Sequence, residues 1–323
     1  MDKRNKKSKI AFIVGKFPAI SETFIINQVA DLNDRGVEIE IFSFTEGVFE
    51  NISQRFYDYE MVSKTHYLNM PENVFSRCLL AIPKIFKFLV HNPAALARVF
   101  NFKKYGRDAL SLKLLYWTEP FFDKQFDLYH CHFGQIANKF LIIKEILGIK
   151  EKMTTSFYGL DVSSYTKEKG AGVYDRLKKE CFAFIVMSNN MKERVVAQGF
   201  DESKITVLPI SIEVDPYPFW ERSLGPDETI QMVSIGRFVE KKGFDDLLRA
   251  LAIVKQRTTK LFKCHIIGGG PLEAGLKKMT NELNLGDAVE YKGYMKIEDI
   301  IKYFQDMHFY LQPSKTAANG DME

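Results

Sequence analysis

Two cations, Arg237 and Lys242, stand between an apolar run and a helical pattern in the C-terminal third of the chain. Residues 230–235 are typical of a buried strand, and apolar residues recur at helical spacing after Gly243. Turns of this kind border the ligand crevice of parallel α/β sheets, where the first N–H groups of the helix favour an anion. Because arginine can donate to two oxygens while lysine acts as a point charge, the pair predicts a diphosphate site.

If that diphosphate belongs to a sugar nucleotide, the two cations would act on the leaving group. Negative charge grows on the phosphate as the glycosidic C–O bond breaks, so cations placed in advance stabilise the transition state more than the ground state. The alternative is a pair of solvated surface cations, but the flanking Gly236 and Gly243 favour binding. The run Gly268, Gly269 and Gly270 after the next strand either contacts the donor or only makes a tight turn.

Two histidines, His130 and His132, lie two residues apart at the end of an apolar run in the first half of the chain. On a strand they share one face, near the carboxyl edge where ligands bind. They are either acceptor-site residues or structural histidines with satisfied hydrogen bonds. A metal pair is a third reading, but no third ligand is evident.

The loop 16–24 follows the first apolar run and contains Ser21 and Glu22. Serine often caps a helix at such a place, and capping is compatible with ligand contact. We expect this loop to belong to the acceptor side of the site.

These residues must be positioned by a regular alternation of strands and helices. Strand-like runs at 10–14, 37–44, 128–132, 153–157, 182–187 and 205–208 are mostly separated by helical patterns, and a second series has runs at 230–235, 263–267, 288–294 and 309–312. The sequence therefore predicts an α/β fold with two doubly wound domains that face a cleft. We expect an N-terminal domain at 1–215, a linker at 216–228 and a C-terminal domain at 229–323, whose sheet looks incomplete.

Composition fits a globular protein without extensive disorder. The 323 residues are 46% apolar and 27% charged, with a formal net charge of +4. The four cysteines show no Cys-x-x-Cys spacing, which indicates reduced thiols in a cytosolic protein. No run is long enough and free enough of charge to span a membrane. Nucleic-acid motifs are also missing.

The region 83–116 mixes apolar residues with lysines and arginines. A basic amphipathic face of this kind can lie on anionic lipid, whereas the alternative is helices packed on the domain with a charged outer face. We expect peripheral contact with the inner face of the cell membrane.

Five short motifs follow one another in the second half: Gly236-Arg237 with Lys242-Gly243, then 268–271, then 292–294, then 312–314 and finally 320–323. Their order and spacing resemble those of retaining glycosyltransferases of family 4. In the first half, Lys16-Phe17-Pro18 with 21–24 and the run 130–134 resemble colanic-acid and amylovoran-type exopolysaccharide glycosyltransferases. The resemblance covers nearly the whole chain and implies the GT-B fold, which has two Rossmann-like domains.

The resemblance also implies roles for single residues. Arg237 and Lys242 would hold the donor diphosphate without a metal or cofactor. Glu323 matches the first of two family glutamates and would approach the donor sugar, while the second would lie beyond the last residue, so the chain is expected to be truncated there. Where the family usually has a histidine near the reacting sugar, this sequence has Tyr158, which is a poor base, followed by Asp161 as a possible acceptor of sugar hydroxyls.

The sequence thus predicts a metal-independent glycosyltransferase of the hexosyltransferase type. It would move a sugar from a nucleoside-diphosphate sugar to a hydroxyl of a growing, lipid-linked exopolysaccharide or cell-surface glycan. Two alternatives remain: an inactive truncated fragment that only binds, and a sugar-nucleotide epimerase on the same fold.

Overall fold

A computed structural model describes residues 7–212, 214–219 and 221–322 of the chain. They form two compact units. The first contains the described residues of 7–49 and 55–210, and the second contains 50–54 and those of 211–322. The short segment 50–54 joins the second unit, where Ser53 and Gln54 donate hydrogen bonds to the carboxylate of Glu298.

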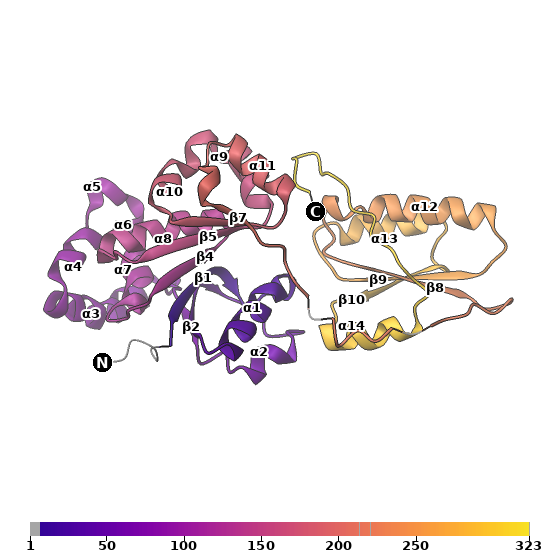
Figure 1. Cartoon of the computed structure of the whole chain (residues 1–323), viewed down its shortest axis with the longest axis horizontal. Coiled ribbons are helices and arrows are strands. Elements are labelled where there is room, and N and C mark those ends of the chain that lie inside the picture. Colours follow the sequence, from indigo (N-terminus) through magenta and orange to yellow (C-terminus); the bar gives the residue numbers. More distant parts are fainter. Residues whose placement is uncertain (1–6, 213, 220, 323) are drawn as a thin grey trace. The chain divides into compact units, whose positions relative to one another are not determined.

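The first unit is built on a parallel seven-stranded sheet in the order β3-β2-β1-β4-β5-β6-β7. The strands are β1 (Lys9–Phe17), β2 (Glu38–Glu46), β3 (Thr65–Tyr67), β4 (Leu128–His132), β5 (Lys152–Phe157), β6 (Ala183–Val186) and β7 (Ile205–Val207). Helices lie on both sides of this sheet (Figure 1). They are α1 (Thr23–Asp34), α2 (Gln54–Asp58), α3 (Val74–His91), α4 (Pro93–Val99), α5 (Phe102–Tyr105), α6 (Arg107–Leu110), α7 (Lys113–Thr118), α8 (Gly134–Leu147), α9 (Ser164–Lys169), α10 (Asp175–Glu180) and α11 (Asn189–Ala197).

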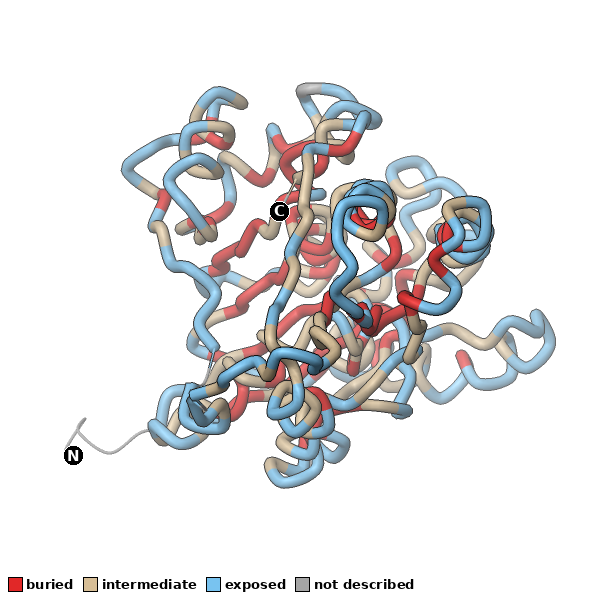
Figure 2. The backbone as a smooth tube through the Cα atoms, turned by 90° about the vertical axis from the view of Figure 1, so that its right-hand side faces the viewer, coloured by how far each residue is buried: buried red, intermediate tan, exposed pale blue. Residues whose placement is uncertain are grey.

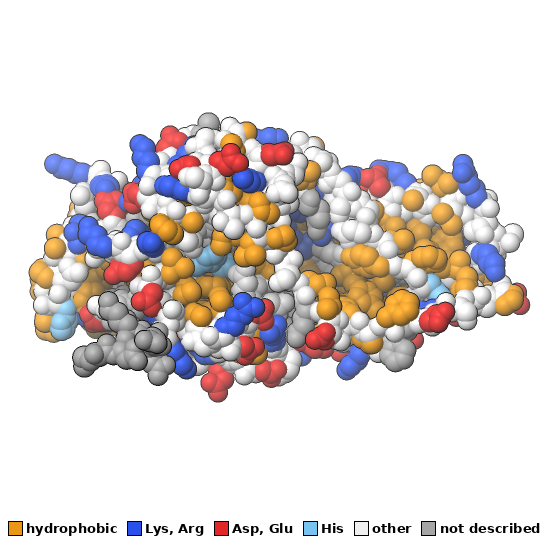
Figure 3. All heavy atoms as spheres, in the orientation of Figure 1, with side chains coloured by type: hydrophobic (Ala, Val, Ile, Leu, Met, Phe, Trp, Pro, Cys, Tyr) orange, Lys and Arg blue, Asp and Glu red, His pale blue; other side chains and the backbone are white. Residues whose placement is uncertain are grey.

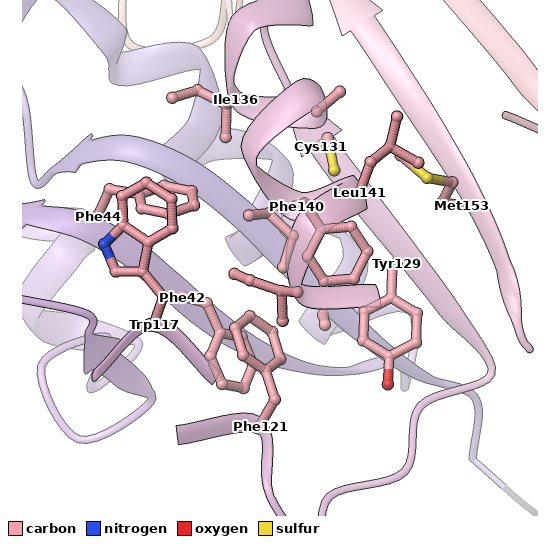
Figure 4. Packing of buried hydrophobic residues seen from close by; sticks show 14 of the residues in the cluster. Phe42, Phe44, Trp117, Phe121, Tyr129, Cys131, Ile136, Phe140, Leu141 and Met153 are labelled. Atoms are coloured by element: carbon pink, nitrogen blue, oxygen red, sulfur yellow. The ribbon is translucent and has the colours of Figure 1, made fainter. Parts of the chain in front are cut away.

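The core of the first unit is rich in aromatic rings. Phe42 stacks on Phe121 with ring centroids 4.0 Å apart, and Tyr129 stacks on Phe140 of α8 at 5.0 Å (Figure 4). Buried residues follow the strands, as expected for a sheet covered on both faces (Figure 2). This packing fixes β4, which carries the two histidines, and β5, which Tyr158 directly follows.

The second unit has a parallel sheet in the order β10-β9-β8-β11. Its strands are β8 (Ile230–Ile235), β9 (Phe262–Ile267), β10 (Val289–Gly293) and β11 (Phe309–Tyr310), and its helices are α12 (Phe244–Arg257), α13 (Glu273–Glu282) and α14 (Ile297–Tyr303). Leu248, Leu251 and Ile266 are among the residues of its own core. The predicted α/β class is therefore confirmed. Among the described residues, β11 is an edge strand of this sheet, and its side chains are exposed.

The region 83–116 belongs to α3 to α7, and part of its apolar surface packs on the domain, as in the alternative that the sequence left open. Val99 is buried, and Ile85, Leu96 and Phe100 pack against the core. Lys84 and Lys87 both reach the Glu119 carboxylate, at 2.7 and 3.4 Å. No described helix is both long and apolar enough to cross a membrane.

Candidate functional site

The turn after β8 is held against the turn after β9. The N–H of Gly236 donates to the carbonyl of Ile267, and that of Phe238 donates to the carbonyl of Gly269, at 3.0 and 2.8 Å. A Cβ at Gly268 would overlap the Gly236 carbonyl oxygen, and one at Gly270 would lie 2.9 Å from the backbone of Phe238. The glycine run is thus required by the close approach of the two turns, and donor contact remains a proposal.

The two predicted cations, Arg237 and Lys242, flank Gly236 on this turn. Arg237 is exposed, and no ion pair holds its guanidinium within the described part of the chain. The Lys242 side chain passes over Gly236, where an added Cβ would lie 3.2 Å from Lys242 Cδ. The structure therefore brings both cations to one place at the carboxyl end of β8.

The carboxylates near this turn are taken up by other cations. Lys315 Nζ lies 2.7 Å from Asp245 and 2.8 Å from Asp246, and Lys241 Nζ lies 3.2 Å from Asp321. Because these carboxylates are already paired, they compete less with a bound anion for Arg237. The motifs gave no signal for Lys241 or Lys315, because each acts through a partner distant in sequence.

The start of α12 is covered by the loop after β11. Gly243 has φ +66°, and a Cβ there would overlap the Pro313 carbonyl oxygen. Lys315 N–H donates to the Lys241 carbonyl at 2.8 Å, and Ala318 N–H donates to Glu240 Oε1 at 2.9 Å. The loop thus contacts the turn after β8. Glu323 itself lies outside the described residues.

In the first unit, His130 is fully engaged by β5. Its Nδ1 lies 2.8 Å from Thr154 Oγ1, and its Nε2 lies 3.0 Å from Ser156 Oγ. Burial lowers the pKa of His130 to about 4, so the ring is neutral near pH 7. These contacts favour a structural role for His130. Alternating polar residues on β5 were the available sequence signal for this pairing.

His132 differs from its neighbour because only one ring nitrogen has a partner. Nδ1 lies 2.8 Å from the Tyr158 hydroxyl, whereas the buried Nε2 has no hydrogen-bond partner among the described residues. Burial, aided by the neighbouring His130, holds the pKa of His132 well below its usual value. The residue after His132, Phe133, has φ +72° and ψ 136°, a strained backbone of the kind found at functional sites.

Tyr158 stacks near the histidines and the start of α1. Its ring lies 4.5 Å from that of Phe24 and 5.9 Å from that of His132. Burial raises the pKa of Tyr158 far above its usual value, and the carboxylates of Asp161 and Glu22 add to this rise. The phenol therefore stays protonated and can act only through hydrogen bonds.

Asp161 is fully buried and its carboxylate is occupied. Oδ2 accepts from the Gly134 N–H, and Oδ1 accepts from those of Tyr158 and Gly159, at 3.0 to 3.1 Å. Burial raises the pKa of Asp161 to about 6, although these three bonds act against the rise. The arrangement favours a positioning role, tying the turn after β4 to the loop after β5, over direct contact with a sugar.

The loop before α1 carries Ser21 and Glu22. Glu22 occupies the N-cap position of α1, and no side-chain capping bond is present there among the described residues. Ser21 is exposed and does not cap α1. The proximity of Glu22 to Tyr158 places this loop beside the histidine cluster.

Comparison with known proteins gives one family. A family model described as glycosyl transferases group 1 matches residues 218–320. The amylovoran biosynthesis glycosyltransferase AmsK of Erwinia amylovora is 32% identical over an alignment 329 residues long. The alignment covers 98% of this chain and 77% of AmsK.

Solved structures agree in fold. Anabaena HepE, in complex with UDP and glucose, matches with a TM-score of 0.62 at 14% identity, over 96% of this chain and 75% of HepE. Sucrose-phosphate synthase from Thermosynechococcus elongatus matches with a TM-score of 0.58 at 15% identity, over 95% of this chain and 76% of its own. The predicted GT-B architecture is confirmed, and neither the epimerase nor the inactive-fragment alternative is favoured.

Proposed function

The chain belongs to the group 1 glycosyl transferases and is related to those of exopolysaccharide biosynthesis, and on that premise we propose its reaction in detail. It transfers a sugar from a nucleoside diphosphate to a hydroxyl of a growing, lipid-linked polysaccharide, with retention at the anomeric carbon. The donor side belongs to the second unit and the acceptor side to the first. The reaction takes place on the cytoplasmic side of the cell membrane.

One observation carries this proposal: Arg237 and Lys242 flank Gly236 at the carboxyl end of β8. The exposed guanidinium can donate to two phosphate oxygens, and the ammonium adds a second positive charge. Both gain interaction energy as the diphosphate leaves, because the charge on its oxygens rises during bond cleavage. Two cations on the same turn provide charge compensation without a metal ion.

The proton of the attacking hydroxyl needs an acceptor. We assign it to the leaving phosphate, which becomes more basic as the bond to the sugar breaks and lies on the face that the hydroxyl attacks. The neutral His132, with Nε2 unpartnered in the described structure, is assigned to bind a hydroxyl of the acceptor, and Tyr158 holds its ring.

Calorimetric titration of UDP and GDP into the chain tests the donor site. Each lost bond to a charged group is worth about 1.5–3 kcal/mol, so Arg237→Ala or Lys242→Ala should weaken binding by about 10- to 150-fold. Arg257→Ala is the matched control, because Arg257 is an exposed arginine at the far end of α12. Equal binding by the wild type and a folded Arg237→Ala variant would refute the assignment.

A further inference from the structure

The long helix α3 is attached to the first unit by one side only. Ala81 and Phe88 are its buried residues. On the same side, Lys84 and Lys87 bond to Glu119, and their ammonium groups lie over the rings of Tyr116 and Phe122 at 5.5 and 5.0 Å. The charges of this helix are therefore directed toward the domain.

The opposite side of α3 is apolar and exposed. Its largest members are between 56% and 77% exposed, and they recur at steps of three and four residues along the helix: Phe75, Leu79, Ile82, Phe86 and Leu89. We call these five residues the outer face of α3. Cys78, Pro83 and Val90 adjoin them on the helical wheel and are also uncharged and exposed. In Figure 3, hydrophobic side chains reach the surface at the left end of the first unit, where Figure 1 labels α3.

The surroundings of the outer face are strongly basic. Residues 74–113 contain eight lysines and arginines and one aspartate, an excess of seven positive charges. The whole chain has a formal net charge of +4, so the remaining residues sum to −3. Glu119, Glu145 and Asp108 pair with four of these cations, Lys84, Lys87, Lys104 and Lys113. Among the described residues, the cations of this segment without an ion pair are Arg77, Arg98, Lys103 and Arg107, and this remaining positive charge complements an anionic surface.

We propose that the outer face of α3 inserts into the headgroup and acyl boundary of an anionic lipid bilayer, with the helix lying parallel to the membrane. The outer face spans 15 residues, 75–89, which at 1.5 Å each give a contact about 22 Å long. The outer face offers only hydrocarbon and aromatic surface and lies in a segment with an excess of positive charge, which is the pattern of a helix that lies in the interface of an anionic membrane. Insertion buries that surface, while the surrounding cations attract lipid phosphates.

This inference rests on the proposed lipid-linked acceptor, which would bring the protein to a membrane, and its test needs no nucleotide or acceptor. If the protein does not bind vesicles, the result of the UDP and GDP titration is unaffected. If it does not bind UDP or GDP, the result of the vesicle titration is unaffected.

The chain contains a suitable reporter for the test. Among the described residues, Cys78 is the exposed cysteine, whereas Cys131, Cys181 and Cys264 are buried. A polarity-sensitive maleimide dye on Cys78 is titrated with vesicles of phosphatidylglycerol and phosphatidylethanolamine, and with neutral phosphatidylcholine vesicles. We expect a saturable blue shift of the dye with the anionic vesicles and a much weaker response with the neutral ones.

Variants separate insertion from simple charge attraction. Phe75→Ser with Phe86→Ser should lower partitioning into anionic vesicles by at least about tenfold, because two exposed aromatic side chains no longer insert. Ile253→Ser with Leu261→Ser, which removes exposed apolar side chains from the second unit, should change it less than about twofold. Circular dichroism confirms folding in each case, and exposed positions leave the core intact.

Three results would overturn the proposal. One is the absence of a dye response when the folded wild type meets anionic vesicles. Another is equal partitioning of the wild type and the Phe75→Ser, Phe86→Ser variant. The last is a blue shift without vesicles that rises with protein concentration and accompanies a dimer in sedimentation, which would assign the outer face to a second copy of the chain.

Discussion

At the scale of single residues, the histidines on β4 are controlled by burial. His130 has hydroxyl partners on both nitrogens and a pKa of about 4, while His132 depends on Tyr158 for one nitrogen. Charging either ring would place an ion in a site where no carboxylate of the described residues acts on it, which is costly. Both rings therefore act as neutral hydrogen-bonding groups over the working range of pH.

The first prediction concerns pH and His130. Between its ordinary pKa of 6.5 and its native pKa of about 4, the unfolded chain binds a proton that the native chain does not, so stability falls as pH falls through this window. The shift corresponds to about 3 kcal/mol. Asp161, with its pKa raised to about 6, acts in the opposite sense between pH 6 and 4, because the native state binds its proton first.

A comparison of variants isolates the histidine, since Asp161 is present in both chains. Urea unfolding of the wild type and of His130→Asn is measured from pH 6.5 to 4.5. The wild type should lose about 2–3 kcal/mol more than the variant over this range. Identical pH dependence in the two chains would contradict the assignment.

The second prediction concerns Tyr158. Tyr158→Phe removes the hydroxyl that holds His132 Nδ1, leaving a buried nitrogen unpaired at a cost of about 1–3 kcal/mol. Transfer should fall by about tenfold to a hundredfold in kcat/KM, while the affinity for UDP stays the same. Tyr165→Phe, a phenol packed against the core, is the control. Loss of UDP binding in Tyr158→Phe would place the residue on the donor side instead.

The sequence predicted part of this residue arrangement. The two-residue spacing correctly predicted that His130 and His132 lie together, and the turn that carries Arg237 and Lys242 lies between a strand and a helix, as the sequence predicted. The hydroxyl partners of His130 and the occupied carboxylate of Asp161 were not predicted, because they depend on the alignment of β4 with β5 and on a loop that folds back.

At the scale of elements, the turn after β8, which is the proposed donor site at 236–243, depends on Gly243. This residue combines φ +66° with contact to the Pro313 carbonyl. Gly243→Ala should therefore cost about 1–3 kcal/mol of stability and weaken UDP binding, because the loop after β11 must move. Thermal unfolding and calorimetry check both effects.

The control for Gly243 is another glycine in the same unit. Gly275 lies in α13, where an added Cβ meets nothing within 4 Å. Gly275→Ala should leave UDP binding unchanged and stabilise the chain by up to about 1 kcal/mol. If the two variants behave alike, the loop contact at Pro313 does not support the donor turn.

Long elements were predictable and short ones were not. The runs 128–132 and 230–235 match β4 and β8 in both bounds, because continuous apolar runs between turn residues mark buried parallel strands. The sequence did not predict the three-residue strand β3 or the seven-residue helix α14. Segments this short contain too few apolar residues to show a hydrophobic period. The run 309–312 is shorter in the structure, where only Phe309 and Tyr310 pair with β8.

At the scale of the whole molecule, each unit has a core of its own. A ligand that binds one unit should therefore stabilise that unit alone. At a hundred times its Kd, UDP should add about 2.7 kcal/mol to the second unit. Hydrogen exchange should slow in β8 and α12 and stay unchanged in β4 and β5.

Arg237→Ala serves as the control for this measurement, because a 10- to 150-fold loss of affinity should lower the stabilisation at the same UDP concentration to about 0.3–1.4 kcal/mol. Equal slowing in both units would contradict independent stabilisation. No exchange response at all, together with calorimetric binding, would show that the nucleotide binds without ordering its site.

The position of the first sheet in the sequence determines when it can form during synthesis by the ribosome. All seven strands of the first sheet are complete at Val207, and 116 residues follow in the 323-residue sequence. At about 5–20 residues per second, their translation takes about 6–23 s. A nascent chain can therefore assemble its amino-terminal sheet, and display the outer face of α3, while most of the second unit is still being made.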